Sequence, residues 1–234
     1  WKVCPECQAR MKAEGLVEVE ELQSYMVKRI EDFAHEHGKR IIGWDEILEG
    51  GLSENATVMS WRGIDGGIEA AKQGHDVIMT PGSGGMYLDW YQGDPRIEPI
   101  TIPSASFPMS NTYGFDPVPD VIREAGLGKH VLGVQCNNWS EYMYSNAKME
   151  YMMYPRSLAM AEVAWSPLSR KNYTDFCKRL DATVVRLDQR HVNYHIPLPE
   201  QPFGSCDKVI ITKDTDLTFT TTRPMKMVYT LDGT

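Results

Sequence analysis

Apolar positions along this chain alternate between helical spacing and short continuous runs of strand length. Between Glu20 and His37, apolar side chains recur every three or four residues, and Gly38 follows directly. This spacing is typical of an amphipathic helix that ends at a glycine. Continuous apolar runs of strand length come next, at residues 39–44 and 57–61. The pattern therefore predicts one helix followed by two short strands.

The alternation continues to about residue 190. Further helices are predicted over 66–73, 118–124, 147–164 and 173–190, and further strands over 75–80 and 131–135. Helices that alternate with strands at this spacing predict a parallel sheet with helical crossovers, either a doubly wound sheet or a (β/α)8 barrel. Four strand–helix units equal half of such a barrel, so we expect the α/β domain, residues 1–197, to be part of a longer one.

The pattern changes near Leu198. Beyond it, β-forming side chains cluster or alternate with no helical stretch between them, at residues 209–211, 217–220 and 225–231. We expect residues 198–234 to begin a small β-rich accessory domain of antiparallel strands. The chain opens at Trp1 with neither Met nor an apolar leader, and it stops in a turn sequence. We therefore expect a piece of a longer protein, whose compartment the sequence does not indicate.

Composition narrows the class of protein. Of the 234 residues, 42% are apolar and 24% are charged, which is ordinary for a globular protein and excludes a disordered chain, collagen or a coiled coil. The 24 basic residues are scattered among 32 acidic ones, giving a net charge of −8, so a nucleic-acid partner is not expected. The most apolar stretch, residues 149–165, is interrupted by Glu150, Arg156 and Glu162, and no membrane span is expected.

Cysteine and histidine spacing does not favour a metal site. Cys4 and Cys7 form an isolated CxxC pair among five cysteines, which favours a local disulfide or two free thiols over a zinc or redox site. His191 and His195 lie four residues apart near the end of the last predicted helix, where contact with helix carbonyls is commoner than metal binding. We expect no metal and no cofactor.

Aromatic and carboxylate side chains gather where the predicted strands end. The groups are Trp44 with Asp45 and Glu46, Trp61 with Arg62, Tyr87 with Asp89, and Trp139 with Glu141. Ligand sites of parallel α/β proteins lie beyond the carboxyl ends of the strands. One tryptophan there is more often a packing residue, but three of six at such positions favour a pocket for a sugar, whose apolar face stacks on aromatic rings. Asp45 and Glu46 are adjacent and point to opposite faces, so we do not expect them to be a catalytic pair.

These residues lie in stretches that resemble the family-20 glycoside hydrolases, the β-N-acetylhexosaminidases. The resemblance runs from Trp1 to about Arg190 and implies the second half of the catalytic (β/α)8 barrel, strands five to eight. The stretches that carry it are Ile42–Glu46, Val58–Gly63, Pro81–Asp89, Tyr113–Pro117 and Gly133–Glu141, and they occur in that order. The tail after the barrel resembles, more weakly, an accessory domain of many members.

The resemblance implies a retaining mechanism in which the 2-acetamido oxygen of the substrate attacks the anomeric carbon. In the family, a glutamate protonates the leaving oxygen and the aspartate before it orients the acetamido group. That pair ends strand four, so we expect it upstream of Trp1, while Asp45 and Glu46 stand at the strand-five position. The 234-residue chain alone is therefore expected to be inactive.

The resemblance also implies roles for individual residues. Tyr87 matches the catalytic tyrosine that binds the acetamido carbonyl oxygen. Asp89 and Glu141 match acceptors for ring hydroxyl groups, with Glu141 at O4 or O6, and Trp90 is a candidate for one further aromatic contact. Three tryptophans match the aromatic walls around the N-acetyl group: Trp44, Trp61 and Trp139.

Two alternatives stay open beside an exo-acting β-N-acetylhexosaminidase. The first is a non-catalytic carbohydrate-binding relative that keeps the aromatic pocket but has lost the acid. The second is a redox or metal module built on Cys4 and Cys7. The partners that the resemblance implies are glycans that end in N-acetylhexosamine or chito-oligosaccharides, and it favours export over the cytoplasm.

Overall fold

The computed structural model describes residues 1–200 and 211–233. The chain divides into two compact units. Unit 1 holds residues 1–83 and 117–135, and unit 2 holds residues 84–116 and the described residues from 136 onward. This division does not follow the boundary predicted at residue 197, and the two domains expected from the sequence stay a prediction.

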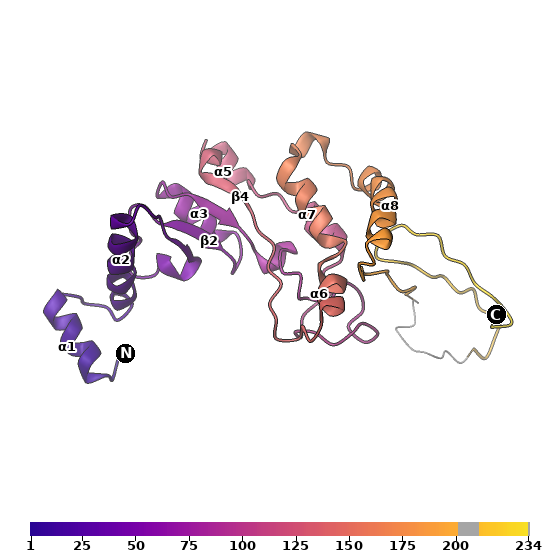
Figure 1. Ribbon diagram of the computed structural model, residues 1–234, viewed down its shortest axis with the longest axis horizontal. Coiled ribbons are helices and arrows are strands. Elements are labelled where there is room, and N and C mark those ends of the chain that lie inside the picture. Colours follow the sequence, from indigo (N-terminus) through magenta and orange to yellow (C-terminus); the bar gives the residue numbers. More distant parts are fainter. Residues whose placement is uncertain (201–210, 234) are drawn as a thin grey trace. The chain divides into compact units, whose positions relative to one another are not determined.

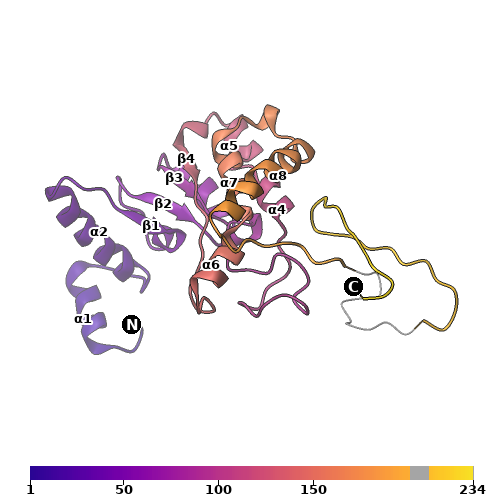
Figure 2. The same cartoon turned by 45° about the vertical axis from the view of Figure 1, so that its right-hand side comes forward.

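Unit 1 is built around a four-stranded parallel sheet. The strands are β1 (Ile42–Trp44), β2 (Thr57–Ser60), β3 (Val77–Met79) and β4 (Val131–Val134). They lie in the order of the sequence (Figure 2), with every neighbouring pair parallel. The helices of this unit are α1 (Pro5–Glu14), α2 (Glu21–Glu36), α3 (Asp65–Lys72) and α5 (Asp120–Glu124). A sequential parallel sheet with helical crossovers is the arrangement of a TIM-barrel-type fold, and the α/β prediction is confirmed.

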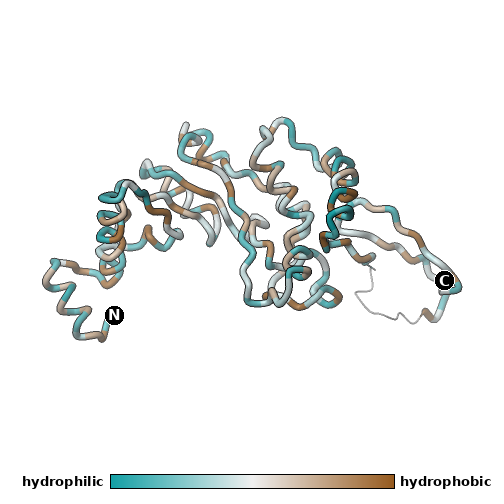
Figure 3. The backbone as a smooth tube through the Cα atoms, in the orientation of Figure 1, coloured by the Kyte–Doolittle hydropathy of each residue, from teal (hydrophilic) through white to brown (hydrophobic). Residues whose placement is uncertain are grey.

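Apolar side chains explain why these strands form. Val58, Val77 and Met79 are completely buried, and the hydropathy of the chain in Figure 3 is apolar along the strands. Helix α3 packs closely on the sheet, because a Cβ atom on Gly67 would lie 2.7 Å from Cε of Met79. The backbone N–H of Gly67 also donates to the Ser60 hydroxyl, at 2.9 Å. Burial of the two central strands, β2 and β3, accounts for their continuous apolar character, whereas Ile42 of β1 and Leu132 of β4 are exposed.

Unit 2 is mostly helical. Its helices are α4 (Met109–Gly114), α6 (Asn146–Met153), α7 (Arg156–Trp165) and α8 (Tyr173–Gln189). Helices α7 and α8 lie side by side (Figure 1) and enclose a core with α4. The buried members of this core are Met109, Tyr113, Ala159, Phe176, Cys177 and Leu180.

The long helix predicted over 147–164 is two helices, which corrects the sequence prediction. The break falls at Tyr154, whose backbone is extended (φ −101°, ψ 139°), and Pro155 follows. Proline disfavours the helical conformation in the residue before it and has no N–H for the helical ladder. Helix α1 was not predicted, because it buries only Met11 and has no apolar stripe. Helix α4 was also missed, inside the long loop rich in proline and glycine.

The strands predicted beyond residue 198 are not found in the described part of that segment. Residues 209 and 210 lie outside the described residues, and 211–233 contain no strand. One antiparallel bridge joins Glu200 and Thr220, with backbone N···O distances of 2.7 and 3.0 Å. The side chains of Leu217, Phe219 and Val228 are exposed, so this segment buries no apolar face that would stabilise a sheet. Among the described helices, none has the length and apolar character needed to cross a bilayer.

Candidate functional site

The candidate site residues fall into two groups, one in each unit. Trp44 is the last residue of β1 and Trp61 directly follows β2, both in unit 1. Tyr87, Asp89, Trp139 and Glu141 belong to unit 2. All lie at or after the carboxyl ends of strands, where parallel α/β proteins bind their ligands.

In unit 1, the Asp45 carboxylate supports the loop that follows β2. Asp45 is 2% exposed, and its Oδ2 accepts hydrogen bonds from the backbone N–H groups of Trp61 (2.9 Å) and Arg62 (3.2 Å). Its Oδ1 accepts from Nε of Arg62 at 2.5 Å. Arg62 also pairs with Glu49, and the carboxylates of Glu49 and Asp45 raise the pKa of its guanidinium. Asp45 therefore fixes the main chain that carries Trp61.

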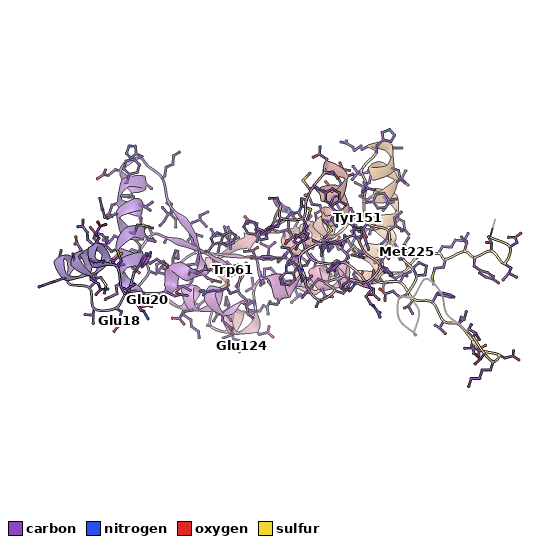
Figure 4. The ribbon with its side chains drawn as sticks, turned by 90° about the horizontal axis from the view of Figure 1, so that it is seen from below. Glu18, Glu20, Trp61, Glu124, Tyr151 and Met225 are labelled. Atoms are coloured by element: carbon purple, nitrogen blue, oxygen red, sulfur yellow. The ribbon has the colours of Figure 1, made fainter. Side chains whose placement is uncertain are left out.

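Glu46 supports the same loop through the side chain of Trp61. Figure 4 labels Trp61. Its indole Nε1 donates to both carboxylate oxygens of Glu46, at 2.9 and 3.1 Å. Gln23 on α2 donates to the backbone carbonyl of Glu46 at 2.6 Å. The two adjacent carboxylates thus have different partners, one holding the main chain of the loop and the other the indole ring.

In unit 2, Tyr87 is part of an aromatic cluster. Its ring meets Trp139 edge-on with a centroid distance of 6.3 Å and Trp90 with a distance of 5.4 Å. A short parallel pairing holds the two loops together, because the N–H of Leu88 donates to Asn137 (2.7 Å) and that of Asn137 to Met86 (2.9 Å). Tyr87 is 7% exposed, whereas Trp139 is 39% exposed. The tryptophan therefore presents an accessible aromatic face beside the tyrosine.

Asp89 has the most unusual environment of the candidate residues. Its side chain is completely buried, and neither carboxylate oxygen is in hydrogen-bond geometry with a donor among the described residues. Burial raises the pKa of Asp89 to about 6, against the opposing influence of nearby backbone amides and of the Arg156 charge. The charge of Glu141 acts in the same direction as burial. A buried carboxylate without a protein donor is costly unless a ligand supplies the hydrogen bonds.

Glu141 lies near Asp89 but is exposed. It follows Trp139 on the loop after β4. Its negative charge adds to the rise in the pKa of Asp89. Unit 2 thus brings together four of the predicted residues: Tyr87, Asp89, Trp139 and Glu141. Trp44 and Trp61 are both half-buried in unit 1.

Sequence reasoning gave no role to Arg156, which the structure places at the centre of unit 2 contacts. Its guanidinium is completely buried and donates to the backbone carbonyls of Leu88, Trp90, Phe107 and Met152. Burial lowers its pKa to about 10. The sequence signal that could have identified Arg156 was its place inside the most apolar stretch of the chain. A charged side chain in such a stretch is rarely buried unless it has partners.

His195 has a different partner from the one predicted. It does not contact the carbonyls at the end of α8; its Nε2 lies 2.8 Å from Oε1 of Glu98, and both side chains are buried. The ring also meets Tyr151 of α6, labelled in Figure 4, edge-on at 5.1 Å. The prediction failed because α8 ends at Gln189 and the chain after it folds back over unit 2.

Cys4 and Cys7 are free thiols at the beginning of α1. The spacing favoured either a local disulfide or two free thiols, and the structure has the two free thiols. Within residues 1–200 and 211–233, no group of three or more His, Cys, Asp or Glu side chains is placed to hold a metal ion.

A sequential parallel sheet with helical crossovers defines an α/β protein of the TIM-barrel type. Residues 1–168 match the catalytic domain of glycosyl hydrolase family 20. The chain belongs to this family.

Relatives and a solved structure agree with this membership. A beta-hexosaminidase of Porphyromonas gingivalis is 57% identical over 234 residues, which cover 100% of this chain and 30% of that protein. A beta-hexosaminidase of Vibrio furnissii is 35% identical over 69% of this chain and 26% of its own length. The GH20 exo beta-N-acetylglucosaminidase of Vibrio harveyi in complex with N-acetylglucosamine superposes with a TM-score of 0.77 at 31% identity, over 84% of this chain and 31% of that one. The chain thus spans about a third of the length of the relatives that it matches.

Proposed function

We propose that the whole protein is an exo-acting β-N-acetylhexosaminidase that hydrolyses terminal β-linked N-acetylglucosamine or N-acetylgalactosamine. In this proposal, the chain supplies strands five to eight of the catalytic barrel, and residues 198–234 begin an accessory domain. The observation that carries the proposal is the unit 2 cluster, in which Tyr87 lies against Trp139 and the Asp89 carboxylate is completely buried. The family membership and the names of the relatives support it.

The proposed mechanism uses the substrate as nucleophile. The 2-acetamido oxygen attacks the anomeric carbon while the bond to the leaving oxygen breaks and that oxygen takes a proton from a glutamate expected upstream of Trp1. The Tyr87 hydroxyl donates to the acetamido oxygen, which holds it at attack distance and stabilises the ring that closes. Water then attacks the anomeric carbon as the bond to the acetamido oxygen breaks, the same glutamate takes the proton from water, and the two displacements together retain the β configuration.

The other residues would bind rather than react. Trp139 offers an aromatic face to the N-acetyl group, and Trp44 and Trp61 have the same proposed role. Asp89 and Glu141 would accept hydrogen bonds from ring hydroxyls. The Glu46–Trp61 hydrogen bonds support this assignment, because a ring held through its N–H keeps one orientation.

The test uses the protein extended to its complete barrel. Nitrophenol release is compared between the N-acetyl-β-glucosaminide and the plain β-glucoside, for wild type and Tyr87→Phe, with the exposed Tyr229→Phe as a matched control. We expect cleavage of the N-acetyl substrate alone, a loss of about a hundredfold in Tyr87→Phe, and no change in Tyr229→Phe. Binding of N-acetylglucosamine without any cleavage would instead identify a carbohydrate-binding relative.

A further inference from the structure

Arg156 is a buried cation whose hydrogen bonds go to main-chain oxygens. It is the first residue of α7 and has no exposed surface. Among the described residues, its Nη atoms donate to four backbone carbonyls, and its Nε has no partner. A buried guanidinium is costly to desolvate, as the lowered pKa of Arg156 shows. Such a cost indicates that the protein gains from holding these four carbonyls in place.

Two of the four carbonyls flank Asp89 in the chain. The Nη2 atom donates to Leu88, the residue before Asp89, and to Trp90, the residue after it. The Thr101 hydroxyl donates to the carbonyl of Asp89 itself. Three consecutive carbonyls are therefore held, two by Arg156 on α7 and one by Thr101 in the same connection, which restrains the main chain of Asp89.

The remaining two acceptors anchor the clamp. Nη1 of Arg156 donates to Phe107 at 3.2 Å, and the Phe107 ring packs on Trp90 with a centroid distance of 4.8 Å. Nη2 donates to Met152 of α6 at 3.0 Å. The guanidinium thus ties the loop to two other parts of unit 2.

While its main chain is held, neither carboxylate oxygen of Asp89 reaches full hydrogen-bond geometry with a described donor, although the backbone N–H groups of Asp89 and Trp139 lie close enough to lower its pKa. Restraint of the backbone on both sides fixes the direction of the Cα–Cβ bond of Asp89, and with it the region in which the carboxylate lies. The charge of Arg156 also lowers the pKa of Asp89, opposing the effect of burial.

We propose that Arg156 is a positioning residue for sugar recognition: by clamping the carbonyls of Leu88 and Trp90, it holds the unpartnered Asp89 carboxylate where a ring hydroxyl of the terminal sugar binds. Arg156 itself does not touch the sugar. This inference rests on the proposed function and adds to it the residue that sets the geometry of one hydroxyl contact.

The experiment is a double-mutant cycle in the whole protein, with Arg156→Lys, Asp89→Asn and the double variant. Lysine keeps the charge but loses the planar fork that reaches several carbonyls at once. We expect Arg156→Lys to raise KM for the N-acetyl-β-glucosaminide about tenfold with a smaller effect on kcat. In the Asp89→Asn background, the same substitution should change KM less than about twofold.

Two controls separate positioning from general destabilisation. Arg179→Lys alters a surface arginine of the same unit, which pairs with Glu162 and Asp175, and it should leave KM unchanged. Deoxy substrates, each lacking one ring hydroxyl, should identify a single hydroxyl whose removal abolishes the effect of Arg156→Lys. A purely structural role would lower the melting temperature without this selectivity.

The outcomes are distinguishable. A wild-type protein that neither cleaves nor binds the N-acetyl substrate contradicts the proposed function, and the role of Arg156 fails with it. An active wild type whose KM is unchanged by Arg156→Lys, or whose two KM effects multiply in the double variant, overturns only the inference on Arg156. If Arg156→Lys does not fold while Asp89→Asn does, Arg156 has a folding role and the inference is also wrong.

Discussion

Glu46 and Trp61 are joined through the indole nitrogen, which donates to both carboxylate oxygens at 2.9 and 3.1 Å. A hydrogen bond to a charged acceptor in a half-buried place holds a large ring in one orientation. Because Trp61 is a proposed wall of the N-acetyl pocket, Glu46 acts on that wall through the indole N–H.

Replacement of Glu46 should therefore weaken binding of the N-acetyl group. We expect Glu46→Ala to lower kcat/KM for the N-acetyl-β-glucosaminide about tenfold, corresponding to about 1.4 kcal/mol, and Glu46→Gln, which keeps an acceptor, to lower it less. The measurement is steady-state kinetics on the whole protein. Glu69→Ala is a suitable control, because Glu69 is exposed. Among the described residues, its carboxylate accepts one hydrogen bond, from Gln73 at the end of the same helix. Equal losses in Glu46→Ala and Glu69→Ala would contradict the role of Glu46.

The pH dependence of binding should depend on Asp89. Its pKa of about 6 means that the carboxylate takes up a proton as the pH falls through 6 and loses acceptor capacity for a sugar hydroxyl. We expect KM to rise below about pH 6 in wild type and this dependence to disappear in Asp89→Asn, measured between pH 4.5 and about 8. A wild-type KM that stays constant across this range would show that Asp89 does not bind the substrate through its charged form.

The same pKa affects folding stability with a definite sign. The folded-state pKa of Asp89 lies above its ordinary value of about 3.9, so the native state binds the proton more tightly than the unfolded chain. Stability from this group is thus complete below about pH 4 and is lost as the pH rises through about 6. Asp89→Asn stays neutral, and at pH 8 it should be more stable than wild type by on the order of 3 kcal/mol, as measured by urea unfolding. A lower stability of Asp89→Asn at pH 8 would contradict the burial effect.

Asp45 should matter to stability more than to chemistry. Its carboxylate accepts from two backbone N–H groups and from Arg62 while almost completely buried. Asp45→Ala leaves those donors unsatisfied and should cost about 3 kcal/mol. Thermal unfolding of the whole protein measures the loss, and Asp65→Ala, at an exposed position of the same unit, is the control. A melting temperature of Asp45→Ala equal to that of the control would contradict the supporting role.

The buried Glu98–His195 pair should anchor the chain that follows α8. Removal of one partner leaves the other buried without its hydrogen bond, so Glu98→Ala should destabilise the protein by about 3 kcal/mol. Limited proteolysis should then cut residues 191–200 faster. If Glu98→Ala and His195→Ala have independent, additive effects on stability, the pair does not act as a unit.

Local patterns predicted elements well where apolar periodicity was strong. The helix expected over 20–37 is α2, and the strands expected at 57–61 and 75–80 are β2 and β3. The amphipathic stripe and the buried apolar run are properties of neighbouring residues, so they are readable without the fold. Pro155 also indicates the end of a helix from the sequence alone, and the prediction of one helix over 147–164 did not take it into account.

The candidate site was predicted in part for the same reason. Tyr87, Asp89 and Trp139 could be grouped because parallel strands end at one edge of a sheet, whichever residues they contain. No local pattern, however, shows which protein groups those side chains meet. That Asp89 would be buried without a donor, or that Glu46 would hold Trp61, depends on packing between segments.

The sequence by itself determined the alternation of strands and helices, the α/β class and the chemistry available at the strand ends, because these depend on short-range spacing and residue type. Only the tertiary structure decided what Arg156 and His195 do. Arg156 meets Leu88 across 68 positions and His195 meets Glu98 across 97. Such contacts follow from chain folding over long separations, and the low dielectric of the interior makes each hydrogen bond or missing partner there count far more than the same group in water.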